Sequence, residues 1–155
     1  MVTGSVNLIP DAPVAVIRDL AVRAEELGFS RCWVNDEGLA TRDVYVTMAA
    51  ILRSTERLVV GPGVTNAYTR HPGQTAAAIA TLAEMSSGRA FLGLGAGGSL
   101  TLDTLGLERQ QPLETIRQPI AACRGLFAGD RISVENPGFA FRSARLDYGL
   151  SLIHI

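Results

Sequence analysis

Short apolar runs alternate with longer amphipathic stretches along most of this 155-residue chain. The short runs are bounded by Gly, Pro or polar residues, which predicts buried strands. The longer stretches repeat apolar residues every three or four positions, which predicts helices. The expected strands are 6–9, 31–35, 57–60 and 89–94, and the expected helices are 13–27, 43–54, 72–87 and 113–127. A strand followed by a helix, four times over, indicates a parallel α/β architecture, either doubly wound or a (β/α)8 barrel.

The alternation of strands and helices stops after Gly129. Residues 132–146 alternate loosely around Asn136, Pro137 and Gly138, which predicts a β-hairpin. The last residues, 150–155, are apolar but follow no helix and differ in composition from the rest of the chain. We therefore expect one domain over 1–149, followed by a tail at 150–155 that is not native to it.

The composition narrows the range of functions. The chain is 47% hydrophobic and 19% charged, with a formal net charge of −1 and no block of like charge, so we expect neither nucleic acid nor a membrane surface as a partner. No apolar run has the length of a membrane span, and no signal-peptide pattern is present, which favours the cytoplasm. All 14 basic residues are Arg, which excludes Lys-based phosphate binding and Schiff-base chemistry within the chain. Cys32 and Cys123 lack metal-ligand spacing, so we expect two buried, reduced thiols and no metal site.

Residues suited to chemistry follow the ends of the expected strands. Residues 61–72 place glycine, proline and small polar side chains between the third strand and its helix, where α/β folds hold ligands. Asp36 and Glu37 follow the second strand, where neighbouring side chains diverge, so one can face a pocket while the other braces a loop. A carboxyl group in such a pocket can deliver a proton to a ligand. The alternative is that both are solvated loop acids or helix caps.

Gly93, Gly95 and Gly98 match the G-x-G-x-x-G pattern of dinucleotide-binding proteins. The surroundings do not fit that pattern, because we expect 100–112 to be irregular rather than helical, and because the motif falls in the fourth unit instead of the first. We expect these glycines to let the backbone approach a flat ring or to pack tightly within the fold.

Five segments together resemble the luciferase-like monooxygenase superfamily, and within it the deazaflavin (coenzyme F-420)-dependent oxidoreductases of the methylenetetrahydromethanopterin reductase type. The segments are AEELGF at 24–29, WVNDE at 33–37, RDVY at 42–45, GPGVTNAYTRHP at 61–72 and SGRAFLGLGAG at 87–97. Two positions depart from the family. Glu37 stands where relatives often have His, and Gly98 stands where the glycine run often ends in an acidic residue.

The resemblance implies the fold and the site. A (β/α)8 barrel needs about 250 residues, so the expected fold is the N-terminal half of a barrel, about four βα units plus a β-hairpin excursion. The ring of the cofactor is expected on Gly63, Val64, Thr65 and Asn66, with a cis peptide bond between Gly63 and Val64. Further expected contacts are Gly97, Gly98 and Thr101, and the residues expected to protonate or contact the ring are Asp36 and Glu37.

The resemblance also implies an activity, the transfer of a hydride between reduced coenzyme F-420 and a small organic substrate such as a methylene-tetrahydropterin. We expect a homo-oligomer, and we expect this half barrel to be inactive by itself. The first alternative is a monooxygenase that uses flavin mononucleotide (FMN) and oxygen. The second alternative is a non-catalytic half barrel that pairs with another half.

Overall fold

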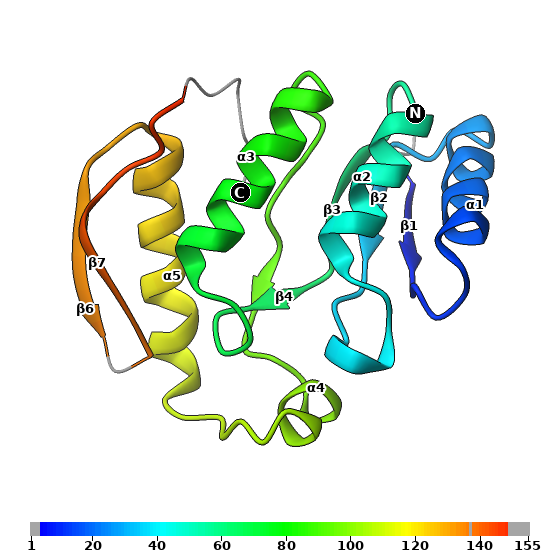
Figure 1. The fold of residues 1–155 in the computed structure, drawn as a ribbon. Helices are drawn as coiled ribbons and strands as arrows, with labels where there is room; N and C mark the ends of the chain where they lie inside the picture. Colours follow the sequence, from blue (N-terminus) through cyan, green and yellow to red (C-terminus); the bar gives the residue numbers. More distant parts are fainter. Residues whose placement is uncertain (1–3, 137, 149–155) are drawn as a thin grey trace.

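The computed structural model describes residues 4–136 and 138–148 and shows strands and helices in alternation (Figure 1). The elements are β1 Ser5–Leu8, α1 Val14–Glu26, β2 Arg31–Val34, the 3-10 helix η1 Gly38–Ala40, α2 Val44–Ser54, β3 Val59–Pro62, β4 Thr65–Asn66, α3 Pro72–Met85, β5 Leu94–Gly95, α4 Ser99–Thr104, α5 Pro112–Phe127, β6 Ile132–Asn136 and β7 Phe139–Ala144. The order confirms the predicted alternation. The tail predicted at 150–155 lies outside the described residues.

The central sheet is parallel, as the short apolar strands predict. β1, β2 and β3 lie side by side in that order, with Ser5 opposite Arg31 and Arg31 opposite Val59. The expected fourth strand runs beside β3 only at one bridge, between Val60 and Ala90. It pairs again farther along, where β5 lies parallel to β4. The fourth strand is therefore interrupted where the third strand bends between β3 and β4.

The third strand begins later than expected because a carboxylate holds the residues before it. Oε1 of Glu25, at the end of α1, accepts hydrogen bonds from the backbone N–H groups of Arg57 and Leu58 at 2.7 Å each, and from Glu56 at 3.1 Å. These N–H groups point to a side chain instead of a neighbouring strand. The expected strand 57–60 is therefore observed as Val59–Pro62.

Glu25→Gln is expected to lower the free energy of unfolding by about 1–2 kcal/mol, near the low end for hydrogen bonds to a charged group because Glu25 is half-exposed. Burial alone would raise the pKa of Glu25, but the N–H groups of Arg57, Glu56 and Leu58 lower it below its ordinary value. The stabilisation is therefore present above the unfolded-state pKa and is lost as the pH falls through the lowered folded-state pKa. Urea unfolding at neutral and acidic pH measures this loss.

Glu26→Gln is the matched control for this stability measurement. Glu26 is exposed and pairs with Arg23 at 2.8 Å, one turn away on the same helix. An exposed pair of this kind contributes little, so the variant should unfold within about 0.5 kcal/mol of the parent. Equal losses for the two variants would show that the contacts made by Glu25 do not stabilise the turn.

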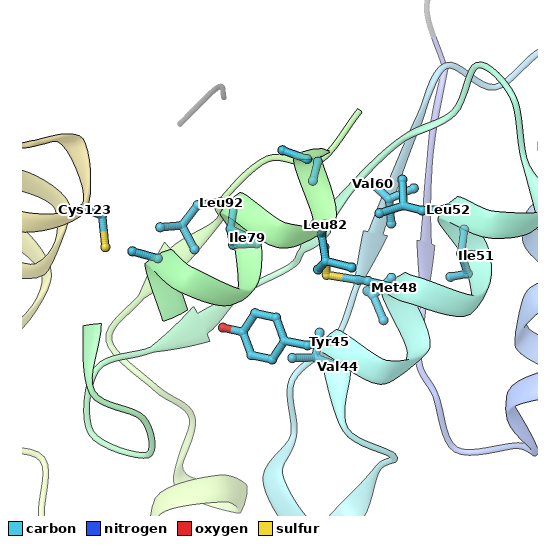
Figure 2. Packing of buried hydrophobic residues seen from close by; sticks show 14 of the residues in the cluster. Val44, Tyr45, Met48, Ile51, Leu52, Val60, Ile79, Leu82, Leu92 and Cys123 are labelled. Carbon is cyan, nitrogen blue, oxygen red and sulfur yellow. The ribbon is translucent and has the colours of Figure 1, made fainter. Parts of the chain in front are cut away.

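The core lies between the sheet and the helices that cover it. Met48 and Ile51 on α2, Val60 on β3, and Ile79 and Leu82 on α3 meet in this layer (Figure 2). The helical spacing of these apolar side chains explains why α2 and α3 form here.

Cys32 on β2 and Cys123 on α5 are both free and fully buried, and burial raises the pKa of each thiol to about 12. The prediction of two buried, reduced thiols is confirmed.

The predicted hairpin is present as β6 and β7, which pair antiparallel. Its Phe139 and Phe141 are buried, and both rings lie edge-on to the ring of His71, at 6.0 and 4.9 Å between ring centroids. Nδ1 of His71 accepts the N–H of Gly73 at the start of α3, and its Nε2 lies 3.1 Å from the carbonyl oxygen of Ala140. One imidazole thus caps α3 and attaches the hairpin to it.

The expectation that 100–112 is irregular is wrong for its first part. α4 begins at Ser99, directly after the glycine run, and buries Thr101 and Leu102. Its six residues form fewer than two turns, so it differs from the long helix that opens a dinucleotide-binding unit. Short-range periodicity did not reveal α4, because too few apolar residues repeat within six positions.

Candidate functional site

The expected site residues lie at the carboxyl ends of the parallel strands. Asp36 and Glu37 follow β2, residues 63–66 link β3 to β4, and Gly97 and Gly98 follow β5. η1, α4 and the loop after β4 all lie at this end of the sheet, toward the bottom of Figure 1. The order of elements thus brings together segments that are more than 60 positions apart in the sequence.

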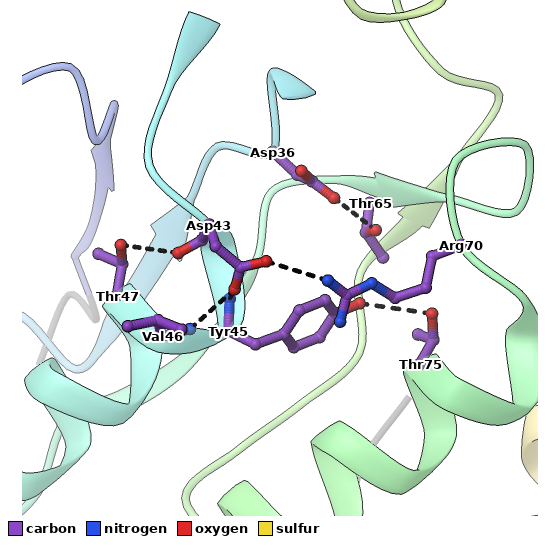
Figure 3. Close-up of polar contacts among 8 residues, drawn as sticks. All are labelled: Asp36, Asp43, Tyr45, Val46, Thr47, Thr65, Arg70 and Thr75. Carbon is purple, nitrogen blue, oxygen red and sulfur yellow. Dashed lines mark hydrogen bonds and ion pairs between the residues drawn. The ribbon is translucent and has the colours of Figure 1, made fainter. Parts of the chain in front are cut away.

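A hydrogen bond joins two of the expected residues. Oγ1 of Thr65 donates to Oδ2 of Asp36 at 2.7 Å, across the gap between β4 and the loop after β2 (Figure 3). The Thr65 side chain is fully buried, whereas Asp36 is half-buried. One oxygen of the Asp36 carboxylate is therefore fixed toward the protein interior.

Glu37 has a different environment from its neighbour. Its Oε1 accepts a hydrogen bond from Nδ2 of Asn35 at 3.3 Å, and its backbone N–H donates to Oγ1 of Thr41 at 3.3 Å. Glu37 precedes η1 but its side chain does not cap that helix. Oδ1 of Asn35 is buried and has no hydrogen-bond partner among the described residues. Asn35 thus has an unused acceptor beside the more weakly held carboxyl group.

The segment from Gly63 to Asn66 has the expected cis peptide bond, between Gly63 and Val64. A Cβ added to Gly63 would lie 2.7 Å from Cβ of Trp33, so only glycine fits there. Val64 is 45% exposed, whereas Asn66 is 2% exposed. The Asn66 side-chain oxygen accepts the N–H groups of Tyr68 and Thr69 at 3.0 Å each. Val64 is therefore the side chain that this segment presents outward, while Asn66 shapes the loop.

The expected contacts after β5 are arranged around α4. Gly97 has φ +73°, in the left-handed region that favours glycine, and its carbonyl oxygen accepts a hydrogen bond from Arg109 at 2.6 Å. Gly98 is exposed, and a Cβ added there would meet nothing within 4 Å. Thr101 is 1% exposed, and its Oγ1 has no partner within the described part of the chain. A Cβ added to Gly38 would lie 2.9 Å from the Thr101 methyl group, so η1 packs closely on α4.

A polar cluster near Asp36 was not expected from the sequence. Asp43 caps α2 by accepting the N–H groups of Tyr45 and Val46 at 3.0 Å each, and its other oxygen lies 3.0 Å from Nη2 of Arg70 (Figure 3). The Arg70 guanidinium carbon lies 4.3 Å from the centre of the Tyr45 ring. The segment RDVY at 42–45 drew attention to Asp43 and Tyr45, but no repeating pattern in the sequence indicates that they contact Arg70.

The Tyr45 hydroxyl lies inside this cluster. It donates a hydrogen bond to Oγ1 of Thr75 at 3.4 Å. Burial raises the pKa of Tyr45 above its ordinary value, and the Asp36 carboxylate adds to the rise. The hydroxyl groups of Thr65 and Thr75 and the charge of Arg70 oppose the rise in this pKa without cancelling it. The phenol is therefore neutral at physiological pH.

A cleft of about 160 Å³ lies beside the site, between the loop after β4, the start of α5 and the tip of the hairpin. Tyr68 lies on one wall, where its hydroxyl donates to the carbonyl oxygen of Gln110 at 2.6 Å. Glu108 and Glu114 give the cleft two carboxyl groups.

Over residues 4–136 and 138–148, no three His, Cys, Asp or Glu side chains gather as they would around a metal ion. Within the same ranges, no helix combines the length and the apolar character that crossing a membrane requires.

Known proteins resemble the chain over nearly its whole length. The sequence profile of the family described as "Luciferase-like monooxygenase" matches residues 2–146. The 5,10-methylenetetrahydromethanopterin reductase of Methanolobus tindarius is 38% identical over 146 residues, which are 94% of this chain and 44% of that protein. The F-420-dependent glucose-6-phosphate dehydrogenase of Microbacterium testaceum is 32% identical over 140 residues, which are 83% of this chain and 41% of that protein.

A solved structure of a full-length reductase shows how much of its fold this chain contains. The coenzyme F-420 dependent tetrahydromethanopterin reductase of Methanopyrus kandleri matches with a TM-score of 0.87 and 28% identity, over 94% of this chain and 46% of that one. The chain spans about half the length of the relatives it matches. The predicted fold, four βα units of a (β/α)8 barrel with a hairpin, is confirmed.

Proposed function

This chain belongs to the luciferase-like monooxygenase family, and from that membership we propose that it forms the N-terminal half of a deazaflavin-dependent oxidoreductase barrel. The full-length protein, with the remaining strands of the barrel, transfers a hydride between reduced coenzyme F-420 and a small organic substrate. The observation that carries the proposal is that relatives with different substrates in their names, a tetrahydromethanopterin reductase and a glucose-6-phosphate dehydrogenase, share dependence on F-420.

The residues at the carboxyl ends of the strands fit a flat ring. Val64 is the outward side chain of its segment, and it would hold the cofactor ring together with the backbone of Gly63, Thr65 and Asn66. Gly98 leaves open space where a Cβ would lie, and Gly97 allows the close approach of Leu102 and Asn66. Oγ1 of Thr101, which has no partner within 4–136 and 138–148, would be available for a hydrogen bond. When bound, the deazaflavin supplies two-electron hydride chemistry. The role of the protein is to bind and orient the cofactor and to exclude water from the site.

The two carboxyl groups take different roles in this proposal. Asp36 is held through Oδ2 by Thr65 and would contact the ring as an oriented acceptor. Within 4–136 and 138–148 the Glu37 carboxyl group accepts one hydrogen bond, the longer one from Asn35 to Oε1, so its Oε2 would be the atom that gives or takes the proton that accompanies the hydride. A methylene-tetrahydropterin is the substrate we propose, because the Methanolobus tindarius relative, a methylenetetrahydromethanopterin reductase, is 38% identical to this chain.

Titration of the full-length protein with coenzyme F-420 and, separately, with FMN tests the proposal. The absorbance and fluorescence of each cofactor change on binding, so two dissociation constants are obtained without turnover. We expect F-420 to bind at least tenfold more tightly than FMN, a difference of about 1.4 kcal/mol. Tighter binding of FMN would favour the monooxygenase alternative. Binding of neither, by a stable oligomer, would favour the non-catalytic half barrel.

A further inference from the structure

We propose that Asn35 is a positioning residue for Glu37, whose Oε1 it holds so that Oε2 is presented to the substrate. The inference deepens the proposed function and rests on it for the role of Glu37 in proton transfer. Both residues lie in the loop after β2, at the end of the sheet where η1 and α4 also lie (Figure 1). Their contact runs from Nδ2 of Asn35 to Oε1 of Glu37, at 3.3 Å.

The backbone of Asn35 is fixed by the sheet. Its N–H donates to the carbonyl oxygen of Leu8 at 3.0 Å, which continues the pairing of β1 and β2 beyond Val34. Side chains alternate between the two faces of a strand, so Asn35 shares a face with Trp33, opposite the fully buried Val34. Trp33 is the side chain on which Gly63 packs. Asn35 therefore lies on the face of the sheet that carries the segment proposed to hold the cofactor ring.

The contact with Glu37 sets which way the Asn35 amide points. An ionised carboxylate has no proton to donate, so the amide turns its NH2 group toward Oε1 and its carbonyl oxygen away. When Glu37 carries a proton on Oε2, Oε1 still has lone pairs that accept from Nδ2. The same contact therefore serves both protonation states, and in both of them Oε2 is the oxygen left for the substrate.

The fold itself gives no reason for an amide at position 35. Oδ1 of Asn35 is buried and accepts no hydrogen bond from any residue in 4–136 or 138–148. A buried acceptor without a partner is unfavourable for folding, and leucine would fill nearly the same space without polar atoms. The one side-chain hydrogen bond that Asn35 makes within the same ranges is the bond to Glu37. The amide is therefore accounted for by its effect on Glu37.

Loss of this contact would free the carboxyl group without moving the loop. The backbone of Glu37 is held separately, because its N–H donates to Oγ1 of Thr41 at 3.3 Å. The neighbouring carboxylate of Asp36 is held by Thr65, at 2.7 Å. Without Asn35, the Glu37 side chain could rotate while its backbone and Asp36 stayed in place, so the proton would be presented to the substrate in several orientations.

Urea unfolding of Asn35→Leu in the full-length protein separates this role from a structural one. The change removes a long hydrogen bond and an unpaired buried acceptor together, so the midpoint of unfolding should stay the same or rise. Asn136→Leu is the matched control, because its amide is bonded at both ends, from Nδ2 to Gln118 at 2.7 Å and from the N–H of Gly138 to Oδ1 at 2.9 Å. The midpoint of this control should fall. An equal fall for Asn35→Leu would overturn the proposal.

Steady-state kinetics of the full-length holoenzyme test the link to Glu37. Asn35→Leu is expected to lower kcat about 10-fold, as for a hydrogen bond to a charged group, and to leave KM within about threefold of the parent. The double variant of Asn35→Leu and Glu37→Gln should be no slower than Glu37→Gln alone, because glutamine has no acidic proton for Asn35 to direct. Additive losses, or an unchanged kcat in Asn35→Leu, would overturn the proposal. If Asn35→Leu does not fold, the smaller Asn35→Ala replaces it in each measurement.

A third measurement needs no cofactor. The ¹³C chemical shift of the Glu37 carboxyl carbon should change in Asn35→Leu and stay the same in Asn136→Leu. An unchanged Glu37 signal in Asn35→Leu would overturn the positioning role. Because this result depends on neither F-420 binding nor turnover, it separates failure of this inference from failure of the proposed function.

Discussion

Glu37→Gln in the full-length protein is expected to lower kcat about 10²–10⁴-fold, the usual contribution of a general acid. Glutamine keeps the shape of the side chain and the contact with Asn35 but cannot release a proton at Oε2. The dissociation constant of coenzyme F-420 should change less than threefold, well below the roughly 10²-fold minimum expected for the rate. Steady-state kinetics together with the cofactor titration separate the two quantities.

Glu84→Gln is the matched control for this loss of activity. Glu84 is exposed on α3, in its last turn and away from the carboxyl ends of the strands, so the same chemical change should leave kcat unaltered. If the rate of Glu37→Gln stays within about threefold of the parent, well short of the usual range, the proton passes elsewhere. Asp36→Asn would then be the next variant to measure.

Gly93→Ala is expected to lower the free energy of unfolding by about 3 kcal/mol or to prevent folding. An added Cβ would overlap the carbonyl oxygen of Pro62 on β3 and would lie 3.1 Å from the Trp33 ring. Overlap with a flexible side chain can be relieved by rotation, but here the neighbour is backbone in the central sheet. The strand would have to move, and the core packed on it would move too. Urea unfolding followed by circular dichroism measures the loss.

Gly98→Ala provides the comparison for stability. Gly98 follows the same strand, has φ −91° and has open space where the Cβ would lie. Its substitution should change the free energy of unfolding by less than about 0.5 kcal/mol, as is usual for exposed positions. If both variants were equally stable, the overlap between an added Cβ at position 93 and Pro62 could be relieved without loss of stability, and the prediction would be wrong. Together they separate glycines required by packing from those that leave space for a ligand.

The order of strands and helices could be predicted because the apolar pattern of each element is local. α2 repeats apolar residues over three turns, and Asp43 before it is a residue that favours the cap position. The resemblance added the site segments and the cis peptide bond, which no pattern of polarity contains. The strand pattern by itself placed Asp36 just after the second strand, which agrees with the structure.

The details that were missed depend on contacts between distant residues. The start of β3 is set by Glu25, which is 31 to 33 positions from its partners. The bond between Asp36 and Thr65 spans 29 positions, and the pair of Asp43 and Arg70 spans 27. Each of these side chains is by itself compatible with a solvated position on a helix or loop, so a single sequence gives no reason to pair them. α4 was missed for a different reason, since it is too short to show periodicity.

The Glu25 carboxylate has a consequence for how this half barrel could be divided. It ties the end of the first βα unit to the turn that starts the third, and it bypasses the second unit altogether. A polypeptide cut between units one and two would therefore separate an acceptor from three donors, leaving each piece with unsatisfied groups. These contacts hold the first unit to the start of the third, so we expect gene fusion or circular permutation to be tolerated better after α3 than at the boundary between the first and second units.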